Sequence, residues 1–355
     1  MAGEFLPGSG FNTFEQQDQV LVGMSGGVDS SVTVRILQEQ GFAVSGAVIR
    51  FSPAHEKAVE QAQRAAHQLG VPCAVLDVQE QFDAQVIAPF CESYCGGETP
   101  NPCVLCNPGV KFAALCREAD RRGIPYIATG HYARVESDKA GVWHICRAES
   151  TARDQSYMLY RLGQDVLRRL LLPLGDFEKD DVREMAGALG LDCAQTPDSM
   201  EICFIPDGDY AAYIEARGYT GRAGHFIAPD GTDLGAHQGV LHYTVGQRKG
   251  LGIALGRPVF IRSIEPNGNI LLADAGEEFF RTAVLRGVTS PAGTAPAAGD
   301  YKVKIRSAAQ PAAAHFDGAD TLVFAEPVRA PAPGQSAVLY RGDCVMGGGF
   351  IAEVR

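Results

Sequence analysis

Short apolar runs alternate with amphipathic segments in the first part of the chain. Residues 19–22 are apolar, and the spacing of Val32, Ile36 and Leu37 predicts a helix from about residue 29 to residue 40. Strands separated by helices of this length predict an α/β fold with a Rossmann-like parallel sheet and crossover helices. The further segments of this pattern are strands at 43–50, 71–78 and 124–129 and helices at 55–69 and 111–122.

From residue 208 onward the pattern changes to short β-rich segments separated by Gly, Pro and Asn, which is typical of all-β modules. The 355 residues are enough for two or three domains. We therefore expect a flexible tail at 1–17, an α/β domain at 18–207, a small β-rich central domain at 208–276 and a C-terminal β-barrel at 277–355.

Composition excludes several classes of protein. Hydrophobic residues make up 46% and charged residues 21% of the chain, as in ordinary globular proteins. No apolar run reaches the roughly 18 residues of a membrane helix, and the polar, acidic first residues lack the features of a targeting peptide. We therefore expect a cytoplasmic protein without a membrane partner.

The net charge of −11, taken by itself, argues against a nucleic-acid partner. Residues 1–207 hold 17 Lys and Arg against 28 Asp and Glu, so the whole acidic excess lies there. A nucleic-acid partner would therefore have to bind at local basic patches.

Ten cysteines without an export signal predict reduced thiols, metal ligands or catalytic groups rather than a disulfide framework. Five of them lie in periodic apolar segments, where cysteine behaves as a small buried apolar residue. These are Cys73, Cys116, Cys146, Cys193 and Cys344.

A glycine-rich turn between the first strand and the first helix is the strongest chemical signal. Adjacent glycines allow backbone N–H groups to approach a phosphate, serine hydroxyls add donors, and the helix N-terminus adds partial positive charge. The turn is neither a Walker A loop nor a Rossmann G-x-G-x-x-G loop. An ordinary serine-capped turn is the alternative. The predicted phosphate loop consists of Gly23, Met24, Ser25, Gly26, Gly27, Val28, Asp29 and Ser30.

The sequence SGGVDS at 25–30 resembles the pyrophosphate loop of the PP-loop ATP pyrophosphatases. Further segments, in order along residues 19–355, resemble the bacterial tRNA-specific 2-thiouridylase family. They include TPNPCVLCN at 99–107, ATGHY at 128–132, RDQSY at 153–157, EICFI at 201–205 and YTVGQRKGLGI at 243–253.

The resemblance implies an enzyme that uses ATP to adenylate the C2 oxygen of the wobble uridine in Lys, Glu and Gln tRNAs and then replaces that oxygen with sulfur. It implies that Ile49 packs on the adenine, that Gly130 lines the ATP site and that Asp29 helps to hold Mg²⁺. It also implies a persulfide on Cys203, which Cys106 attacks to form a transient Cys106–Cys203 disulfide. A persulfide carrier protein or sulfide would supply the sulfur.

Cys103 departs from the family pattern, which often has an aspartate at this position. The chain thereby has three candidate ligands for a 4Fe-4S cluster, Cys103, Cys106 and Cys203. Thiol and disulfide chemistry without iron is the alternative. A structural zinc held by Cys91, Cys95, Cys103 and Cys106 is a third possibility, although that spacing is cramped for a zinc ribbon.

Candidate tRNA contacts follow from the resemblance, and Arg248 and Lys249 also lie between glycines in a turn suited to phosphates. Two other functions remain open: another PP-loop ATP pyrophosphatase acting on a small metabolite, or a non-catalytic nucleotide- and RNA-binding module. The candidate contacts are Asn101, Pro102, Cys103, His131, Arg153, Asp154, Gln155, Arg248, Lys249, Arg306, Ser307 and Gln335.

Overall fold

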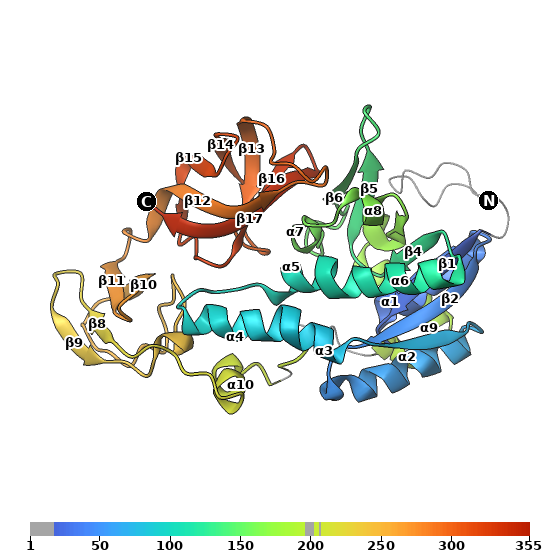
Figure 1. The fold of residues 1–355 in the computed structure, drawn as a ribbon, viewed down its shortest axis with the longest axis horizontal. Helices are drawn as coiled ribbons and strands as arrows, with labels where there is room; N and C mark the ends of the chain where they lie inside the picture. Colours follow the sequence, from blue (N-terminus) through green and yellow to red (C-terminus); the bar gives the residue numbers. More distant parts are fainter. Residues whose placement is uncertain (1–17, 196–201, 206) are drawn as a thin grey trace.

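The computed structural model describes residues 18–195, 202–205 and 207–355, so the predicted tail at 1–17 lies outside the described residues. The first part of the chain contains a five-stranded parallel sheet in the order β3-β2-β1-β4-β7. This confirms the predicted Rossmann-like α/β architecture (Figure 1). The strands are β1 (Gln19–Met24), β2 (Ala43–Arg50), β3 (Cys73–Asp77), β4 (Tyr126–Thr129) and β7 (Leu170–Leu171).

Both faces of this sheet are covered by helices. Val20 and Val22 of β1 pack with α1 (Val28–Glu39) and α2 (Glu56–Gln68). Leu21 points to the opposite face and belongs to the cluster that contains Leu115 and Ala119 of α6 (Phe112–Arg122). Successive side chains of a strand point to opposite faces, so an uninterrupted apolar strand is what a sheet buried on both sides requires.

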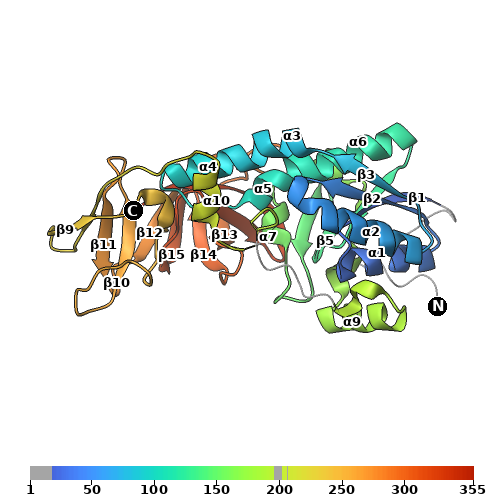
Figure 2. The same ribbon diagram turned by 90° about the horizontal axis from the view of Figure 1, so that it is seen from below.

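Two long helical runs connect the sheet to the rest of the molecule. The first comprises α3 (Gln79–Phe82), a π-helical turn at Asp83–Ile87 and α4 (Ala88–Cys95). The second comprises α5 (Pro102–Cys106), a π-helical turn at Asn107–Lys111 and α6. Figure 2 shows α4 reaching toward the β-rich half of the molecule.

Smaller elements complete the first domain. Helix α9 packs on α1 through Val182 and Ala186, which lie on one helical face and meet Val32 and Ile36. The remaining elements are β5 (Ala133–Ser137), β6 (Trp143–Arg147), α7 (Ser156–Leu159), α8 (Gln164–Leu167) and α9 (Lys179–Ala188).

The central part of the chain forms a small four-stranded sheet in the order β10-β11-β8-β9, preceded by α10 (Tyr210–Ala216). Phe226, Ile261, Ile270 and Leu272 form its core. A small β-rich module after the α/β domain is therefore confirmed. The strands are β8 (His225–Ile227), β9 (Asp233–Ala236), β10 (Val259–Ile264) and β11 (Ile270–Asp274).

The C-terminal part is the predicted β-barrel. Its six strands follow the order β12-β15-β14-β13-β16-β17, and pairing of β12 with β17 closes the barrel. Within the described part of the chain, no helix is both long and apolar enough to span a bilayer. The strands are β12 (Phe279–Thr289), β13 (Gly299–Lys304), β14 (Ala312–Phe316), β15 (Thr321–Arg329), β16 (Ser336–Arg341) and β17 (Cys344–Val354).

The β5–β6 hairpin of the first domain extends the sheet of the barrel. Strand β6 pairs with β17 at Cys146 and Cys344, and these two residues form a disulfide. Cys146 and Cys344 were predicted to be small buried apolar residues without a bond between them, and that prediction is wrong. Strand pairing places the two side chains directly opposite each other, and this pairing joins residues 198 positions apart.

Candidate functional site

The predicted phosphate loop leads from β1 into α1. Gly26 has φ +79°, and a Cβ atom there would lie 2.7 Å from the backbone nitrogen of Ala62, so only glycine fits without a shift. The backbone N–H of Ser25 donates to Ser30 Oγ at 3.1 Å, and Ser31 Oγ donates to the carbonyl of Gly27 at 2.9 Å. The loop is therefore closed on itself by serine side chains.

The N-terminus of α1 lies at this loop without a side-chain cap. Gly27 is the N-cap residue, and it has no side chain to accept from the first turn of the helix. Uncapped N–H groups and the helix dipole together favour an anion at this position. Ser25 is exposed next to them, so the loop is accessible to phosphate groups.

Asp29, in the first turn of α1, accepts from two side chains of distant elements. Lys179 at the start of α9 donates to both carboxylate oxygens, with distances of 2.7 and 2.8 Å. The hydroxyl of Tyr132 donates to Oδ1 at 2.8 Å. Neither Lys179 nor Tyr132 was predicted as a site residue. A charged residue on the buried face of an amphipathic helix is the signal that could have identified Lys179.

Gly130 lies against the same turn of α1. A Cβ atom at this position would lie 2.8 Å from the carbonyl carbon of Asp29 and 2.9 Å from the nitrogen of Ser30. The structure therefore brings the predicted residues Gly130, Asp29 and Ser30 together. Ile49 lies near the carboxyl end of the neighbouring strand β2, where it is 8% exposed and belongs to the core cluster on the α6 side of the sheet.

The predicted sulfur-transfer cysteines belong to two separate segments. Asn101 caps α5, because its side chain accepts from the N–H of Cys103 at 3.1 Å, and Pro102 occupies the first turn. Cys106 ends this short helix, is 8% exposed and directly precedes the π-helical turn. Such turns interrupt helices frequently at functional sites.

Cys203 is exposed, but the residues that follow it are anchored in the core. The ring of Phe204 lies 5.6 Å from that of Phe82 and 5.3 Å from that of Phe90, and Ile205 is 1% exposed. These contacts fix the position of the backbone next to the Cys203 thiol. Glu201, which precedes this segment in the sequence motif, lies outside the described residues.

The three thiols influence one another electrostatically: Cys103 and Cys203 act on the pKa of Cys106, and Cys103 acts on that of Cys203. Burial is the main cause that raises the pKa of Cys106 to about 12, with smaller contributions from the thiols of Cys203 and Cys103 and an opposing one from Lys111. Desolvation by surrounding atoms likewise raises the pKa of Cys203 to about 11, with opposing contributions from Cys103 and Lys111. All three groups are therefore protonated thiols at neutral pH, and Lys111 is the cation that favours their thiolate forms.

Lys111 and His131 connect the thiols to the phosphate loop. Lys111 Nζ lies 3.4 Å from His131 Nε2, and the other ring nitrogen of His131 lies 2.7 Å from Thr129 Oγ1. Burial and the adjacent ammonium group lower the pKa of His131 well below its usual value. His131 directly follows Gly130, which packs on the loop, so the phosphate and thiol sites adjoin. Lys111 belongs to the sequence motif but was not predicted to act in the site.

The four cysteines of the zinc alternative do not converge. Thiolates on one zinc ion lie about 4 Å apart. Within the described residues, the one group of three or more metal-binding side chains whose ligand atoms lie within 4.8 Å of one another is Glu136, Cys146 and Cys344. Cys91 is fully buried on α4, where burial raises its pKa to about 11.

Three of the predicted tRNA contacts make hydrogen bonds or ion pairs within the protein. Asp154 is 8% exposed; its carboxylate accepts from Ser156 Oγ at 3.0 Å and lies 3.6 Å from Lys304 Nζ. Gln155 accepts from the N–H of Tyr132 at 2.9 Å. Arg306 donates to the carbonyls of Val245 and Ala330, at 3.1 Å each, and so joins the central domain to the barrel.

The remaining predicted contacts are partly or largely accessible. Arg153 and Ser307 are half-buried, and Lys249 is exposed. Gln335 donates to the carbonyl of Thr99 at 2.8 Å, two residues before Asn101. This last contact places a residue of the barrel beside the loop that leads to the cysteine helix.

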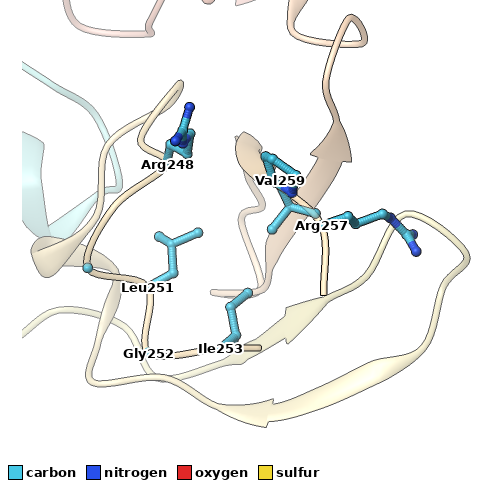
Figure 3. A pocket seen from close by; sticks show the side chains of 8 residues that line it. Arg248, Leu251, Gly252, Ile253, Arg257 and Val259 are labelled. Carbon is cyan, nitrogen blue, oxygen red and sulfur yellow. The ribbon is translucent and has the colours of Figure 1, made fainter. Parts of the chain in front are cut away.

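Arg248 lies at the rim of a pocket in the central domain. The pocket has a volume of about 260 Å³, and Figure 3 shows the side chains of Leu251 and Ile253 between Arg248 and Arg257. Gln247 stabilises the turn, because it accepts from the N–H of Thr244 and donates to the carbonyl of Lys249, at 3.0 Å each. The turn therefore presents its basic residues on a constrained backbone.

The chain is similar to known families over most of its length. Residues 18–207 match the tRNA methyl transferase HUP domain, residues 213–273 the tRNA methyl transferase PRC-barrel domain and residues 287–351 the Aminomethyltransferase beta-barrel domain. The tRNA-specific 2-thiouridylase MnmA of Carboxydothermus hydrogenoformans is 44% identical, with 94% of this chain and 98% of the relative aligned. The protein of the same name from Clostridium botulinum is 41% identical, with 95% and 98% aligned. Among solved structures, a predicted subunit of tRNA methyltransferase from Methanocaldococcus jannaschii is 20% identical, with a TM-score of 0.32 over 48% of this chain and 74% of that chain.

Proposed function

Because this chain belongs to the tRNA-specific 2-thiouridylase family, we propose that it replaces the C2 oxygen of the wobble uridine in Lys, Glu and Gln tRNAs with sulfur in an ATP-dependent reaction. The observation that carries the proposal is the junction at Gly130 and His131. Gly130 packs on the phosphate loop, and His131 contacts Lys111, which acts electrostatically on all three thiols. One site can therefore activate the uridine and transfer sulfur to it.

Adenylation is the first step of the proposed reaction. The uridine O2 attacks the α-phosphorus of ATP, the α–β bridging bond breaks, and pyrophosphate leaves. The N–H groups of the loop and of the α1 N-terminus would bind the leaving phosphates. Mg²⁺ usually binds through one or two carboxylates and the substrate phosphates. Asp29 would hold the ion by sharing with it the carboxylate that also accepts from Lys179, and the ion would neutralise phosphate charge.

Sulfur transfer is the second step of the proposed reaction, and it uses the two segments that contain Cys106 and Cys203. The terminal sulfur of a Cys203 persulfide attacks the uridine C2, and AMP departs with the former O2 oxygen. The Cys106 thiolate then attacks Cys203 Sγ, which releases 2-thiouridine and leaves a Cys106–Cys203 disulfide. A thiol reductant restores both cysteines, and a persulfide carrier protein reloads Cys203.

Product analysis tests this function. Incubation with ATP and an unmodified Lys, Glu or Gln tRNA should yield AMP, pyrophosphate and a uridine whose mass increases by the difference between sulfur and oxygen. Cys203→Ser should abolish thiolation, while the matched variant Cys73→Ser should retain it. ADP and phosphate as main products, or the mass of an added methyl group, would overturn the proposal.

The same assay distinguishes the two other functions. A synthetase acting on a small metabolite would release pyrophosphate without tRNA and would not need Cys203. A non-catalytic module would bind ATP and tRNA without releasing pyrophosphate.

We also propose that Arg248 and Lys249 bind tRNA phosphates. Their turn carries two positive charges on a protein whose net charge is −11, so binding should weaken steeply as salt increases. The double variant Arg248→Ala, Lys249→Ala should lower both the affinity and the salt dependence. A salt dependence equal to that of the wild type would show that the turn is not at the RNA interface.

A 4Fe-4S cluster on Cys103, Cys106 and Cys203 is a second route for sulfur. What supports it is a third thiol beside the other two, since thiolates are the usual ligands of such clusters. Anaerobic reconstitution should then load about four irons, and Cys103→Ala should lose them, whereas Cys91→Ala should not. A Cys103→Asp variant that is active and free of iron would exclude this route.

A further inference from the structure

Lys179 has a buried ammonium group, and the packing of helix α9 does not require a charged side chain at this position. Lys179, Val182 and Ala186 occupy one face of α9, and this face packs on α1. Lys179 is 6% exposed and therefore takes a position that would ordinarily hold an apolar side chain. Burying a charge is costly unless the charge is paired.

Asp29 is the partner that compensates this charge. Both carboxylate oxygens of Asp29 accept from Lys179, and Oδ1 also accepts from Tyr132. The Lys179 ammonium lies 5.8 Å from the centre of the Tyr132 ring, a distance at which a cation is attracted by the ring face. Replacing a buried ion pair with apolar residues is often neutral or stabilising, so stability alone does not account for this arrangement.

The position of the Lys179–Asp29 pair indicates a role in nucleotide binding. Asp29 is in the first turn of α1, within the phosphate loop, and its side chain is 33% exposed. Residues 23–31 contain no lysine or arginine. An uncompensated Asp29 carboxylate there would repel the negatively charged phosphates of ATP.

We propose that Lys179 is a positioning residue for the nucleotide: by neutralising and orienting Asp29 it allows the loop to receive the phosphates of ATP. Lys179 comes from a helix 150 positions later in the chain than Asp29. It thereby supplies from another element the cation that the loop lacks. This inference rests on the proposed use of ATP.

Binding of ATP measured by calorimetry in the presence of EDTA tests the inference without a metal ion and without turnover. Lys179→Met should weaken ATP binding about tenfold or more, and Lys179→Arg should retain most of the affinity. Adding Asp29→Asn to Lys179→Met should restore binding, because the uncompensated carboxylate is then removed. Lys139→Met is the matched control, since it removes an exposed lysine in the turn between β5 and β6 and should bind like the wild type.

Each result has one meaning. Wild-type affinity in Lys179→Met would overturn the inference. Failure of Asp29→Asn to restore binding in a double variant that melts like the wild type would also overturn it, because Lys179 would then act on the phosphates directly. If Lys179→Met did not fold, the affinities of Lys179→Arg and of the double variant would still decide. A wild-type protein that binds ATP in neither EDTA nor Mg²⁺ would instead refute the proposed function.

Discussion

At the scale of single residues, desolvation keeps the thiols of Cys106 and Cys203 protonated at neutral pH. The pKa values of about 12 for Cys106 and about 11 for Cys203 arise mainly from desolvation, and Lys111 opposes both shifts. A thiolate is the nucleophile in sulfur transfer. Of the groups that act on these two pKa values, Lys111 is the one that favours the thiolate form.

Alkylation of Cys203 by iodoacetamide should reveal these raised pKa values. A thiol whose pKa is about 11 is neutral at pH 7, so its alkylation rate should rise about tenfold per pH unit from pH 7 to pH 10. Lys111→Met should slow the reaction at each pH, because it removes the cation that lowers the pKa, whereas Lys139→Met should not. Mass spectrometry of the Cys203 peptide measures the rate. A plateau near pH 8 would contradict the prediction.

Replacing Gly130 with alanine, which adds a single methyl group, should weaken ATP binding. In Gly130→Ala the Cβ atom would meet the backbone of Asp29 and Ser30 at 2.8 and 2.9 Å, so the first turn of α1 would have to move. We expect weaker ATP binding by about tenfold, since displaced N–H groups bind phosphate poorly. Gly187→Ala is the matched control for glycine replacement outside the site, because Gly187 is exposed and nothing lies within 4 Å of its Cβ position. Calorimetry that gave equal affinities for Gly130→Ala and the wild type would contradict the expected contact.

At the scale of elements, the loop before the cysteine helix α5 is held by both β-rich domains. Arg286 of β12 donates to both carboxylate oxygens of Glu98, at 2.6 Å each. The N–H of Thr99 donates to the carbonyl of Pro333 at 2.8 Å, and Arg222 donates to the carbonyl of Gly96 at 2.6 Å. The position of Cys106 therefore depends on residues far from it in the sequence.

Arg286→Met should separate sulfur transfer from nucleotide binding. Loss of the Glu98 contact frees the loop before α5, and we expect thiolation to slow about tenfold because the reacting groups are less well aligned. ATP affinity should stay unchanged, since the phosphate loop belongs to β1 and α1. Arg281→Met removes another arginine from the same strand without touching Glu98. Equal thiolation rates in both variants would show that the Glu98 contact does not position the helix.

At the scale of the whole molecule, the first domain and the barrel share one interface. Asp154, Lys304 and Arg147 form a buried charged network there, and Tyr157 donates to the carbonyl of Ser336 at 2.8 Å. The Cys146–Cys344 disulfide lies at the same interface. The disulfide therefore forms a covalent link between the barrel and the domain that contains the phosphate loop.

The disulfide should stabilise this interface without taking part in the reaction. Cys344→Ser, or reduction of the wild type, should lower the free energy of unfolding by about 2–4 kcal/mol, measured by chemical denaturation. Thiolation at low temperature should continue. Thiol titration of the denatured, unreduced protein should count eight thiols of the ten cysteines. A count of ten would show that the bridge does not form.

Local patterns in the sequence were sufficient to predict four of the five strands of the parallel sheet and the glycine-rich turn between β1 and α1. The apolar run of β1, the glycines at 26 and 27 and the capping residue Asn101 act on their immediate neighbours. Backbone conformation and helix capping depend on such near neighbours, so a sequence shows them directly.

Contacts between distant segments required the folded chain. The sequence contains no sign that Lys179 binds Asp29, that His131 meets Lys111 or that Cys146 faces Cys344, because each pair results from the packing of separate elements. The burial of Asp154 between domains has the same cause. Residue type and spacing predict which chemistry is available, whereas the distances and the desolvation that direct this chemistry arise only when helices, sheet and barrel pack together.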